Sequence, residues 1–209
     1  KTTLIKLLAG LEKPIEGTIY YGDDDLQKLS YRKRSTIFSY VPQQANVTSD
    51  VSVKQYLSYG TTNTLAFYEH PGKEEMERVE EVAKKLKITH LLEKNLGEIS
   101  GGELQIVLIA CALIQDTEIM LLDEPTSALD MKNQNLVLSL LKDISKEENK
   151  TIIISSHNPN HALFLEANVV LSHNVVVCDE VPANDLIKVD KLVPIYRDHV
   201  CVSKDLGYE

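Results

Sequence analysis

In this 209-residue chain, the segment MLLDEPTSALD, from Met120 to Asp130, is the most informative for predicting the fold. A short apolar run leads into two adjacent carboxylates, Asp123 and Glu124, immediately before Pro125. The run is typical of a buried strand. Two like charges at the end of such a strand repel each other and are costly to desolvate. We therefore expect a positively charged species to bind at this strand end.

Further apolar runs alternate with helical patterns on both sides of this stretch. STIFSYVPQQ, ending at Pro42, and KTIIISSH predict two more buried strands, GTIYYG predicts a short strand from Gly17 to Gly22, and VVLSHNVVVCDE predicts a strand pair. Near-continuous apolar strands that alternate with helices are typical of a mainly parallel sheet covered on both faces. The predicted fold class is therefore α/β.

Helical patterns fill most of the remaining chain. They are TTLIKLLAGLEKP, SVKQYLSYG, KEEMERVEEVAKKLKI, ELQIVLIACALIQ, MKNQNLVLSLLKDISKEEN and PNHALFLEA. In the third of these, apolar residues at helical spacing predict core packing rather than a cofactor site: Met76, Val79, Ala83 and Leu86. No strand pattern interrupts residues 45–99, so we predict a helical subdomain there, between the two parts of one core, residues 1–44 and 100–209.

Composition excludes several functions. The formal net charge is -9, and the densest basic cluster, Arg32 to Arg34, is typical of a solvated helix face, which argues against nucleic acid as the main partner. The longest apolar run, IVLIACALI, is shorter than the roughly 20 residues of a membrane span. Cys111, Cys178 and Cys201 show no CxxC spacing, which favours a reducing, cytosolic compartment without zinc or disulfides, with Cys111 as a core residue.

Polar residues follow three of the predicted strands. Gln43 follows the first, Asp123 and Glu124 end the second, and His157 follows the third. Because ligands bind beyond the carboxyl ends of parallel strands, we predict one site that contains all four. The run DDD from Asp23 to Asp25 resembles a metal cluster, but its place after Gly22 predicts a solvated turn and a helix N-cap instead.

The first three residues, KTT, run directly into a helix. A helix N-terminus offers free N–H groups to phosphate, a Lys neutralises phosphate oxygens, and a Thr hydroxyl can bind Mg²⁺. KTT alone is not specific, but beside LLDE it identifies the positive species as Mg²⁺ with a nucleotide. Asp123 would hold the metal through water, and Glu124 would orient the water that attacks the γ-phosphate. The alternative, a carboxylate pair that caps a helix, does not explain the preceding strand and the following Pro125.

A second glycine-containing stretch opens a helix at ISGGE, Ile99 to Glu103. A Ser followed by two glycines exposes backbone N–H groups that can approach a phosphate closely, although a flexible N-cap is the alternative. His157 also has an alternative, as a satisfied core residue, but its position directly after IIISS favours a functional role. His157 and His161 have the spacing of a metal pair on a helix, and Pro159 between them argues against one uninterrupted helix.

In this order, the motifs resemble those of the nucleotide-binding subunit of an ABC transporter. KTTLIKLLAGLEKPIEGTI resembles the end of the Walker A loop and its helix, YVPQQ the Q-loop, and ISGGE the signature motif. IMLLDEP resembles Walker B, TSALD the D-loop, and ISSHNPNHAL the switch region. The resemblance runs from Lys1 to the end of the chain and implies a P-loop NTPase (RecA-like) core with an inserted helical subdomain.

The resemblance also implies roles by position, with ATP and Mg²⁺ as cofactors. Residues implied to contact the ATP phosphates are Lys1, Thr2 and Thr3, and those implied to contact Mg²⁺ are Thr2, Gln43 and Asp123. Residues implied in catalysis are Glu124, His157 and Gln43. Two cassettes of this family form a head-to-tail dimer, in which residues of one copy complete the ATP site of the other: Ser100, Gly101, Gly102 and Glu103. Asp130 would couple the two sites.

The chain departs from the family pattern at two places. Leu104, Ile106 and Cys111 stand where arginines are common after the signature, which affects packing or salt links of that helix. The sequence also begins at the Lys of the phosphate loop, without the glycine loop, the first strand or the aromatic residue that stacks on adenine. We therefore expect the chain as given to be a fragment that binds ATP weakly or not at all, hydrolyses none and tends to aggregate.

Within the family, YVPQQ, LDEPTSALDMKNQ, SHNPNHAL and LVPIYRDHVCV most resemble cassettes of importers for iron chelates, haem and cobalamin, whose close relatives import molybdate or tungstate. This implies permease subunits that dock near Val51 to Tyr59, a substrate-binding protein as an indirect partner, and a place at the cytoplasmic face of the membrane. A soluble ABC ATPase of translation or DNA maintenance is the alternative, and the short insertion and acidic charge argue against it. Intact Glu124 and His157 argue against a non-catalytic binding module.

Overall fold

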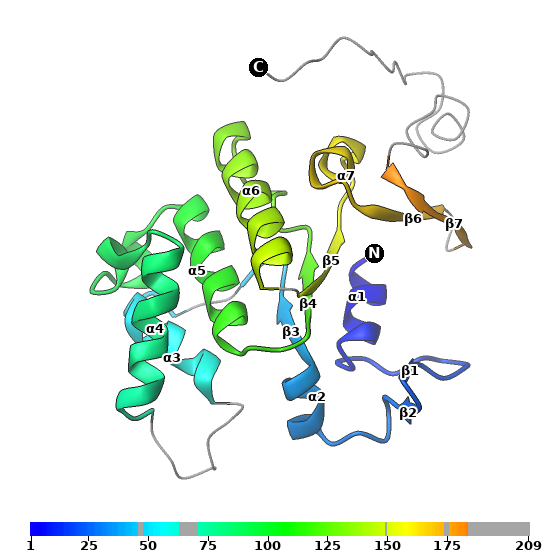
Figure 1. The fold of residues 1–209 in the computed structure, drawn as a ribbon, viewed down its shortest axis with the longest axis horizontal. Coiled ribbons are helices and arrows are strands. Elements are labelled where there is room, and N and C mark those ends of the chain that lie inside the picture. The colour runs from blue at the N-terminus through cyan, green and yellow to red at the C-terminus, as the bar shows by residue number, and fades with distance from the viewer. Residues whose placement is uncertain (46–47, 63–70, 149, 174–175, 184–209) are drawn as a thin grey trace. The chain divides into compact units, whose positions relative to one another are not determined.

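The computed structural model of the chain is shown in Figure 1. It describes residues 1–45, 48–62, 71–148, 150–173 and 176–183. The chain divides into two compact units, residues 1–155 and residues 156–209. The segment LVPIYRDHVCV, residues 192–202, lies outside the described residues.

The first unit is built on a sheet of three parallel strands. These are β3 (Phe38–Val41), β4 (Ile119–Asp123) and β5 (Thr151–Ser155), in the order β3-β4-β5. In this register Asp123 pairs with Ser155. Because all three strands run the same way, their carboxyl ends meet at one edge of the sheet. The prediction of a mainly parallel sheet is confirmed.

Helices cover both faces of this sheet (Figure 1). They are α1 (Thr2–Leu8) on one face and α5 (Gly101–Ile114) and α6 (Met131–Glu147) on the other. Side chains of β4 alternate between the faces: Leu121 packs with Ile5 and Ala9, whereas Met120 and Leu122 join the cluster that contains the buried residues of α5 and α6. Fully buried leucines such as Leu121 and Leu122 each stabilise the fold by about 2 kcal/mol.

Helices fill the described part of residues 45–99. They are α3 (Val53–Ser58), η1 (Tyr59–Thr61), α4 (Lys73–Lys85), η2 (Thr89–Leu91) and η3 (Leu96–Glu98). On the predicted stripe of α4, Val79, Ala83 and Leu86 are buried and Met76 is half-buried, so this face is core packing as expected. Cys111 packs against the same core, and burial raises the pKa of its thiol to about 11. The boundaries at residues 44 and 99 stay a prediction.

The strand predicted for STIFSYVPQQ is partly wrong. Helix α2 (Tyr31–Ile37) takes its first three residues, and only Phe38–Val41 form a strand. The Ser30 side chain accepts a hydrogen bond from the Lys33 N–H and so caps the helix, which then continues through Thr36 and Ile37. Local capping therefore overrides the strand preference of these two β-branched residues.

The stretch around the three aspartates also differs from its prediction. Strand β1 (Tyr20–Tyr21) pairs antiparallel with β2 (Asp24–Asp25), and Gly22 and Asp23 form the two-residue turn between them. Gly22 has φ 56°, the left-handed conformation that such turns require. The expected turn is confirmed, whereas the expected N-cap is wrong because α2 is capped by Ser30.

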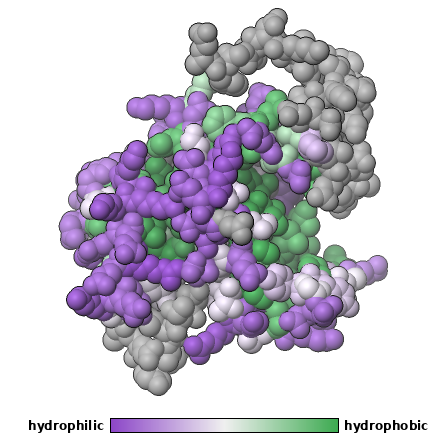
Figure 2. Space-filling model, in the orientation of Figure 1, coloured by the Kyte–Doolittle hydropathy of each residue, from purple (hydrophilic) through white to green (hydrophobic). Residues whose placement is uncertain are grey.

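The second unit begins with α7 (Pro159–Leu165), followed by the antiparallel strands β6 (Asn168–His173) and β7 (Val176–Pro182), which confirms the predicted strand pair. Figure 2 shows that hydrophilic residues cover much of the face seen in Figure 1, with hydrophobic residues visible between them. Among the described residues, no helix combines the length and the apolar character that crossing a membrane requires.

Candidate active site

Asp123 is the last residue of β4 and is buried, with 1% of its surface exposed. Its Oδ1 accepts a hydrogen bond of 2.6 Å from the Ser155 hydroxyl. Within the described part of the chain, its Oδ2 is buried and has no hydrogen-bond partner. An unsatisfied buried carboxylate oxygen is costly, so a cation or a cation-bound water is expected at this atom.

Glu124 follows with a backbone conformation that is rare for residues other than glycine, since its φ is 43°. Its N–H donates to the Ser155 hydroxyl at 3.0 Å and to the Ser155 carbonyl oxygen at 3.2 Å. Left-handed backbone at such a residue costs on the order of 1 kcal/mol, and these bonds to the neighbouring strand hold it in place. Backbone strain kept at the end of a strand is typical of a functional position.

Gln43 lies two residues beyond the end of β3. Its side-chain nitrogen is 3.4 Å from a carboxylate oxygen of Glu124 and 3.3 Å from the Ser127 hydroxyl. The structure therefore brings Gln43, Asp123 and Glu124 to one edge of the sheet. Their chemical roles stay predictions.

Two hydroxyl groups of this cluster were missed in the sequence. Ser155 is bonded to both Asp123 and Glu124, and Ser127 accepts a hydrogen bond from Gln43. The signal for Ser155 was its place at the end of KTIIIS, one strand away from Asp123. Recognising it needed the register of β4 and β5, which pairs these two residues.

The predicted phosphate-binding residues lie at the start of α1. Lys1 is the N-cap and is exposed, Thr2 is the first helical residue, and Thr3 is exposed. The helix ends before Gly10, which has φ 67°. The expected helix at the first residues of the chain is confirmed, and the contact of these side chains with phosphate stays a prediction.

The stretch ISGGE opens α5, with Ser100 as its N-cap. The Ser100 hydroxyl accepts from the Glu103 N–H at 3.3 Å, and a Glu103 carboxylate oxygen accepts from the Ser100 N–H at 2.8 Å and from its hydroxyl at 2.7 Å. Both bonds from Ser100 lower the pKa of the Glu103 carboxyl, and the bond from the backbone N–H has the larger effect. This capping box leaves Gly101 exposed and Gly102 buried at the start of the helix.

Asp130 is the N-cap of α6, and Asn133 connects it to Gly102. One Asp130 oxygen accepts from the Asn133 N–H at 2.8 Å, and the other accepts from the Asn133 side-chain amide at 3.3 Å. A Cβ at Gly102 would lie only 2.7 Å from the Asn133 side-chain carbonyl carbon. The D-loop aspartate and the signature turn are therefore linked through one side chain.

His157 belongs to the second unit and is exposed. His161, the other histidine of this segment, is buried and is 3.0 Å from the Ser156 hydroxyl. Because the two units are separate, the position of His157 relative to Glu124 stays a prediction.

The site has the donors that Mg²⁺ prefers. In proteins this ion is bound through carboxylate oxygens, water and substrate phosphates rather than through cages of protein ligands. The buried Asp123 Oδ2 is such an oxygen, and no described group hydrogen-bonds to it. In the parts of the chain that the structure covers, no cluster of three or more His, Cys, Asp or Glu side chains could hold a metal. The fit to Mg²⁺ therefore rests on Asp123.

Comparison with known proteins shows to which family this chain belongs. The ABC transporter family matches residues 1–127, from α1 to the residues that follow Glu124. The chain therefore belongs to the ABC transporter family, whose cassettes bind nucleotide and hydrolyse ATP. The predicted family and the predicted P-loop NTPase fold are confirmed.

Three similar proteins indicate which members of the ABC transporter family this chain resembles. The "Probable iron chelatin transport ATP-binding protein" of Helicobacter pylori strain J99 is 33% identical over 211 residues, which cover 92% of this chain and 83% of that protein. A chain from a transporter described as metal-chelate type, in an inward-facing conformation, has a TM-score of 0.80 and 28% identity and covers 93% of this chain and 73% of its own. The dimeric ATP-binding cassette MJ0796, bound to ADP and phosphate, has a TM-score of 0.74 and 26% identity, over 87% and 79% of the two chains.

Proposed function

We propose that this chain is the ATP-hydrolysing subunit of an importer for iron chelates. It would act at the cytoplasmic face of the membrane as a head-to-tail dimer bound to permease subunits. Similarity to the iron chelatin protein and to the metal-chelate transporter supports the cargo, and similarity to a dimeric cassette supports the dimer. The observation that carries the catalytic part is the cluster of Gln43, Asp123 and Glu124 at the carboxyl ends of β3 and β4.

In this proposal each side chain has a defined task. Glu124 orients the water that attacks the γ-phosphate, and Asp123 holds the metal through water. Mg²⁺, when bound, neutralises charge on the phosphates. Gln43 contacts Glu124 and Ser127, so any movement of Gln43 alters the surroundings of the attacking water. Phosphate contacts come from Lys1, Thr2 and Thr3, and His157 contacts the γ-phosphate.

The other half of each site comes from the second copy. The backbone N–H groups of Gly101 and Gly102 at the start of α5 face the partner's ATP in this arrangement, whereas the Ser100 N–H is already bonded to Glu103. The Ser100 hydroxyl donates to Glu103, so it exchanges that bond for one to phosphate when the dimer closes. Asp130 then couples the two sites.

Ser155→Ala tests the support of the two carboxylates. We expect kcat to fall about tenfold, because the change removes the donor to Asp123 and one acceptor of the Glu124 N–H, bonds that together contribute on the order of 1–2 kcal/mol. Phosphate release at saturating ATP measures the loss. Ser155→Thr should retain most activity because it keeps the hydroxyl, and Ser139→Ala on the exposed face of α6 is the control. A kcat that stays near wild type in Ser155→Ala would remove Ser155 from the site.

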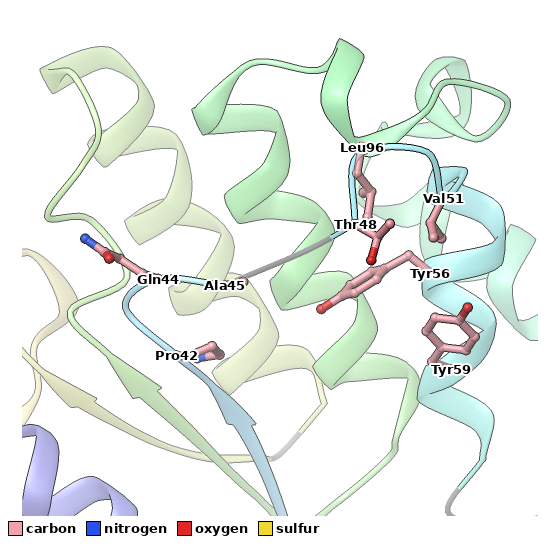
Figure 3. Close-up of a pocket in the computed structure, with 8 residues that line it drawn as sticks. All are labelled: Pro42, Gln44, Ala45, Thr48, Val51, Tyr56, Tyr59 and Leu96. Carbon is pink, nitrogen blue, oxygen red and sulfur yellow. The ribbon is translucent and has the colours of Figure 1, made fainter.

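A groove next to Gln43 supports a permease docking site in this region. Its volume is about 410 Å³, and it is lined by Pro42, Gln44, Ala45, Thr48, Val51, Tyr56, Tyr59 and Leu96 (Figure 3). Pro42 and Gln44 flank Gln43 in the chain, and Tyr56 and Tyr59 come from the helical segment. The two tyrosine rings meet edge to face at 6.1 Å, and burial raises the pKa of Tyr56 to about 12. An apolar permease segment in this groove would contact residues on both sides of Gln43, so nucleotide-driven movement of Gln43 would reach it.

Charges in this groove should uncouple transport. We expect Val51→Asp and Tyr59→Asp to abolish most uptake in reconstituted vesicles, because an unpaired carboxylate in an apolar interface is costly, and to spare ATP hydrolysis by the isolated dimer. Gln55→Glu is the control, since Gln55 is exposed on α3, between Val51 and Tyr59 in the chain, and does not line the groove. Unchanged uptake in both aspartate variants would show that the permease docks at another surface.

The cargo needs its own experiment. The full-length protein is reconstituted with its permease and binding protein, and ATP hydrolysis and uptake are measured with a ferric chelate, haem, cobalamin and molybdate. We expect the ferric chelate to stimulate both. Stimulation by molybdate alone would show that the cargo is molybdate rather than an iron chelate, and the assignment as an ATPase would still hold. Full hydrolysis that never depends on a membrane partner would favour the soluble class of ABC ATPase.

A further inference from the structure

His161 lies in the first turn of α7, and only 8% of its surface is exposed. Both ring nitrogens have partners in the preceding turn. Nδ1 is 3.0 Å from the Ser156 hydroxyl, and Nε2 is 3.2 Å from the side-chain nitrogen of Asn158. His161 thus contacts the two residues on either side of His157, while His157 itself is exposed. These bonds use both ring nitrogens within the protein, so the role of His161 is hydrogen bonding rather than metal binding.

The direction of these hydrogen bonds follows from Asn158. Its side-chain oxygen accepts from the Asn160 N–H at 3.0 Å, which fixes the amide so that its NH₂ group faces the ring. An NH₂ group only donates, so Nε2 of His161 must accept. The neutral ring therefore carries its proton on Nδ1 and donates it to the Ser156 hydroxyl. The same hydroxyl accepts from the Asn158 N–H at 3.1 Å, which closes the network.

The neutral ring is the form that this turn requires. Protonation of Nε2 would place an N–H against the NH₂ group of Asn158 and break that bond. Burial lowers the pKa of His161, and the nearby His157 lowers it further. The turn is therefore held by an uncharged histidine at neutral pH.

We propose that His161 is a positioning residue for His157. Its ring is hydrogen-bonded to both Ser156 and Asn158, so the chain on both sides of the exposed His157 is held in place. This inference rests on the proposed role of His157 at the γ-phosphate. In this inference His161 does not contact the substrate. His161 affects catalysis only because it holds the backbone of His157 in place.

The test compares His161→Leu with His161→Gln in the full-length protein. We expect His161→Leu to lower kcat about tenfold with KM for ATP changed less than about twofold, because two hydrogen bonds of the turn are lost. His161→Gln should recover most of kcat, since its amide can accept from Asn158 and donate to Ser156. Asn160→Ala is the matched control, because only the backbone of Asn160 enters the network and its side chain is exposed.

A double-mutant cycle separates positioning from simple stability. If His161 acts through His157, His161→Leu should cause little further loss of kcat in the His157→Ala background. Additive losses, or an unchanged kcat in His161→Leu, would overturn the proposal. Where His161→Leu does not yield folded protein, Ser156→Ala carries the same cycle with the same criteria. Normal hydrolysis by His157→Ala alone would instead overturn the proposed role of His157, which keeps the two failures apart.

Discussion

Glu124→Gln is expected to bind Mg-ATP normally and to lose most turnover, by a factor on the order of a hundred or more. The amide has nearly the shape of the carboxylate but cannot attract the proton of the attacking water. The side chain of Gln43 should keep a partner at residue 124, since the Gln side-chain oxygen still accepts a hydrogen bond. We propose that hydrolysis separates the two copies of the dimer, so the variant should accumulate as an ATP-bound dimer. Phosphate release measures the first effect and sedimentation with ATP the second.

The control for this variant is Glu81→Gln, which makes the same chemical change at an exposed position of α4. It should hydrolyse ATP at the wild-type rate and remain monomeric after turnover. Turnover near wild type in Glu124→Gln would remove Glu124 from the catalytic role. Glu124→Gln could also bind ATP without hydrolysing it and remain a monomer. That result would contradict the proposal that bound ATP holds two copies together until it is hydrolysed.

Gly102→Ala is expected to weaken ATP-driven dimerisation at least about tenfold and to destabilise the fold by about 1–3 kcal/mol. The new Cβ would lie 2.7 Å from the Asn133 side-chain carbonyl carbon, so Asn133 must move. That movement breaks the hydrogen bond from the Asn133 side-chain amide to Asp130, and the signature turn and the D-loop are disturbed together. Thermal unfolding measures the first effect, and sedimentation of a hydrolysis-deficient background with ATP measures the second.

Two further variants identify the cause of the Gly102→Ala defect. Gly101→Ala should cost little stability, because a Cβ at that position meets nothing within 4 Å. Adding Asn133→Ala to Gly102→Ala removes the clashing atoms and should recover most of the lost stability, although the side-chain bond to Asp130 is not restored. Equal stability losses in the Gly101 and Gly102 variants would show that the contact with Asn133 is unimportant.

The amino-acid sequence alone predicts the family, the order of the motifs and the existence of most helices and strands. Buried strands such as IMLLD and IIIS are recognisable because both faces of a parallel strand are apolar, and this pattern is local. The positions of Gln43, Asp123 and Glu124 followed from the rule that ligands bind beyond strand ends. Where local signals competed, as in STIFSYV, the pattern misled, because the Ser30 cap starts a helix that the apolar run alone does not reveal.

The side chains that support the site are brought to it by packing between distant parts of the folded chain. Ser155 reaches Asp123 and the Glu124 N–H because β4 and β5 pair in one particular register, which joins residues more than 30 positions apart. Asn133 reaches Gly102 because α5 and α6 lie on the same face of the sheet. Such contacts depend on packing geometry between distant segments, and no local pattern of residues encodes that geometry. The sequence therefore predicts which groups take part in the reaction, whereas packing specifies which side chains hold those groups in place.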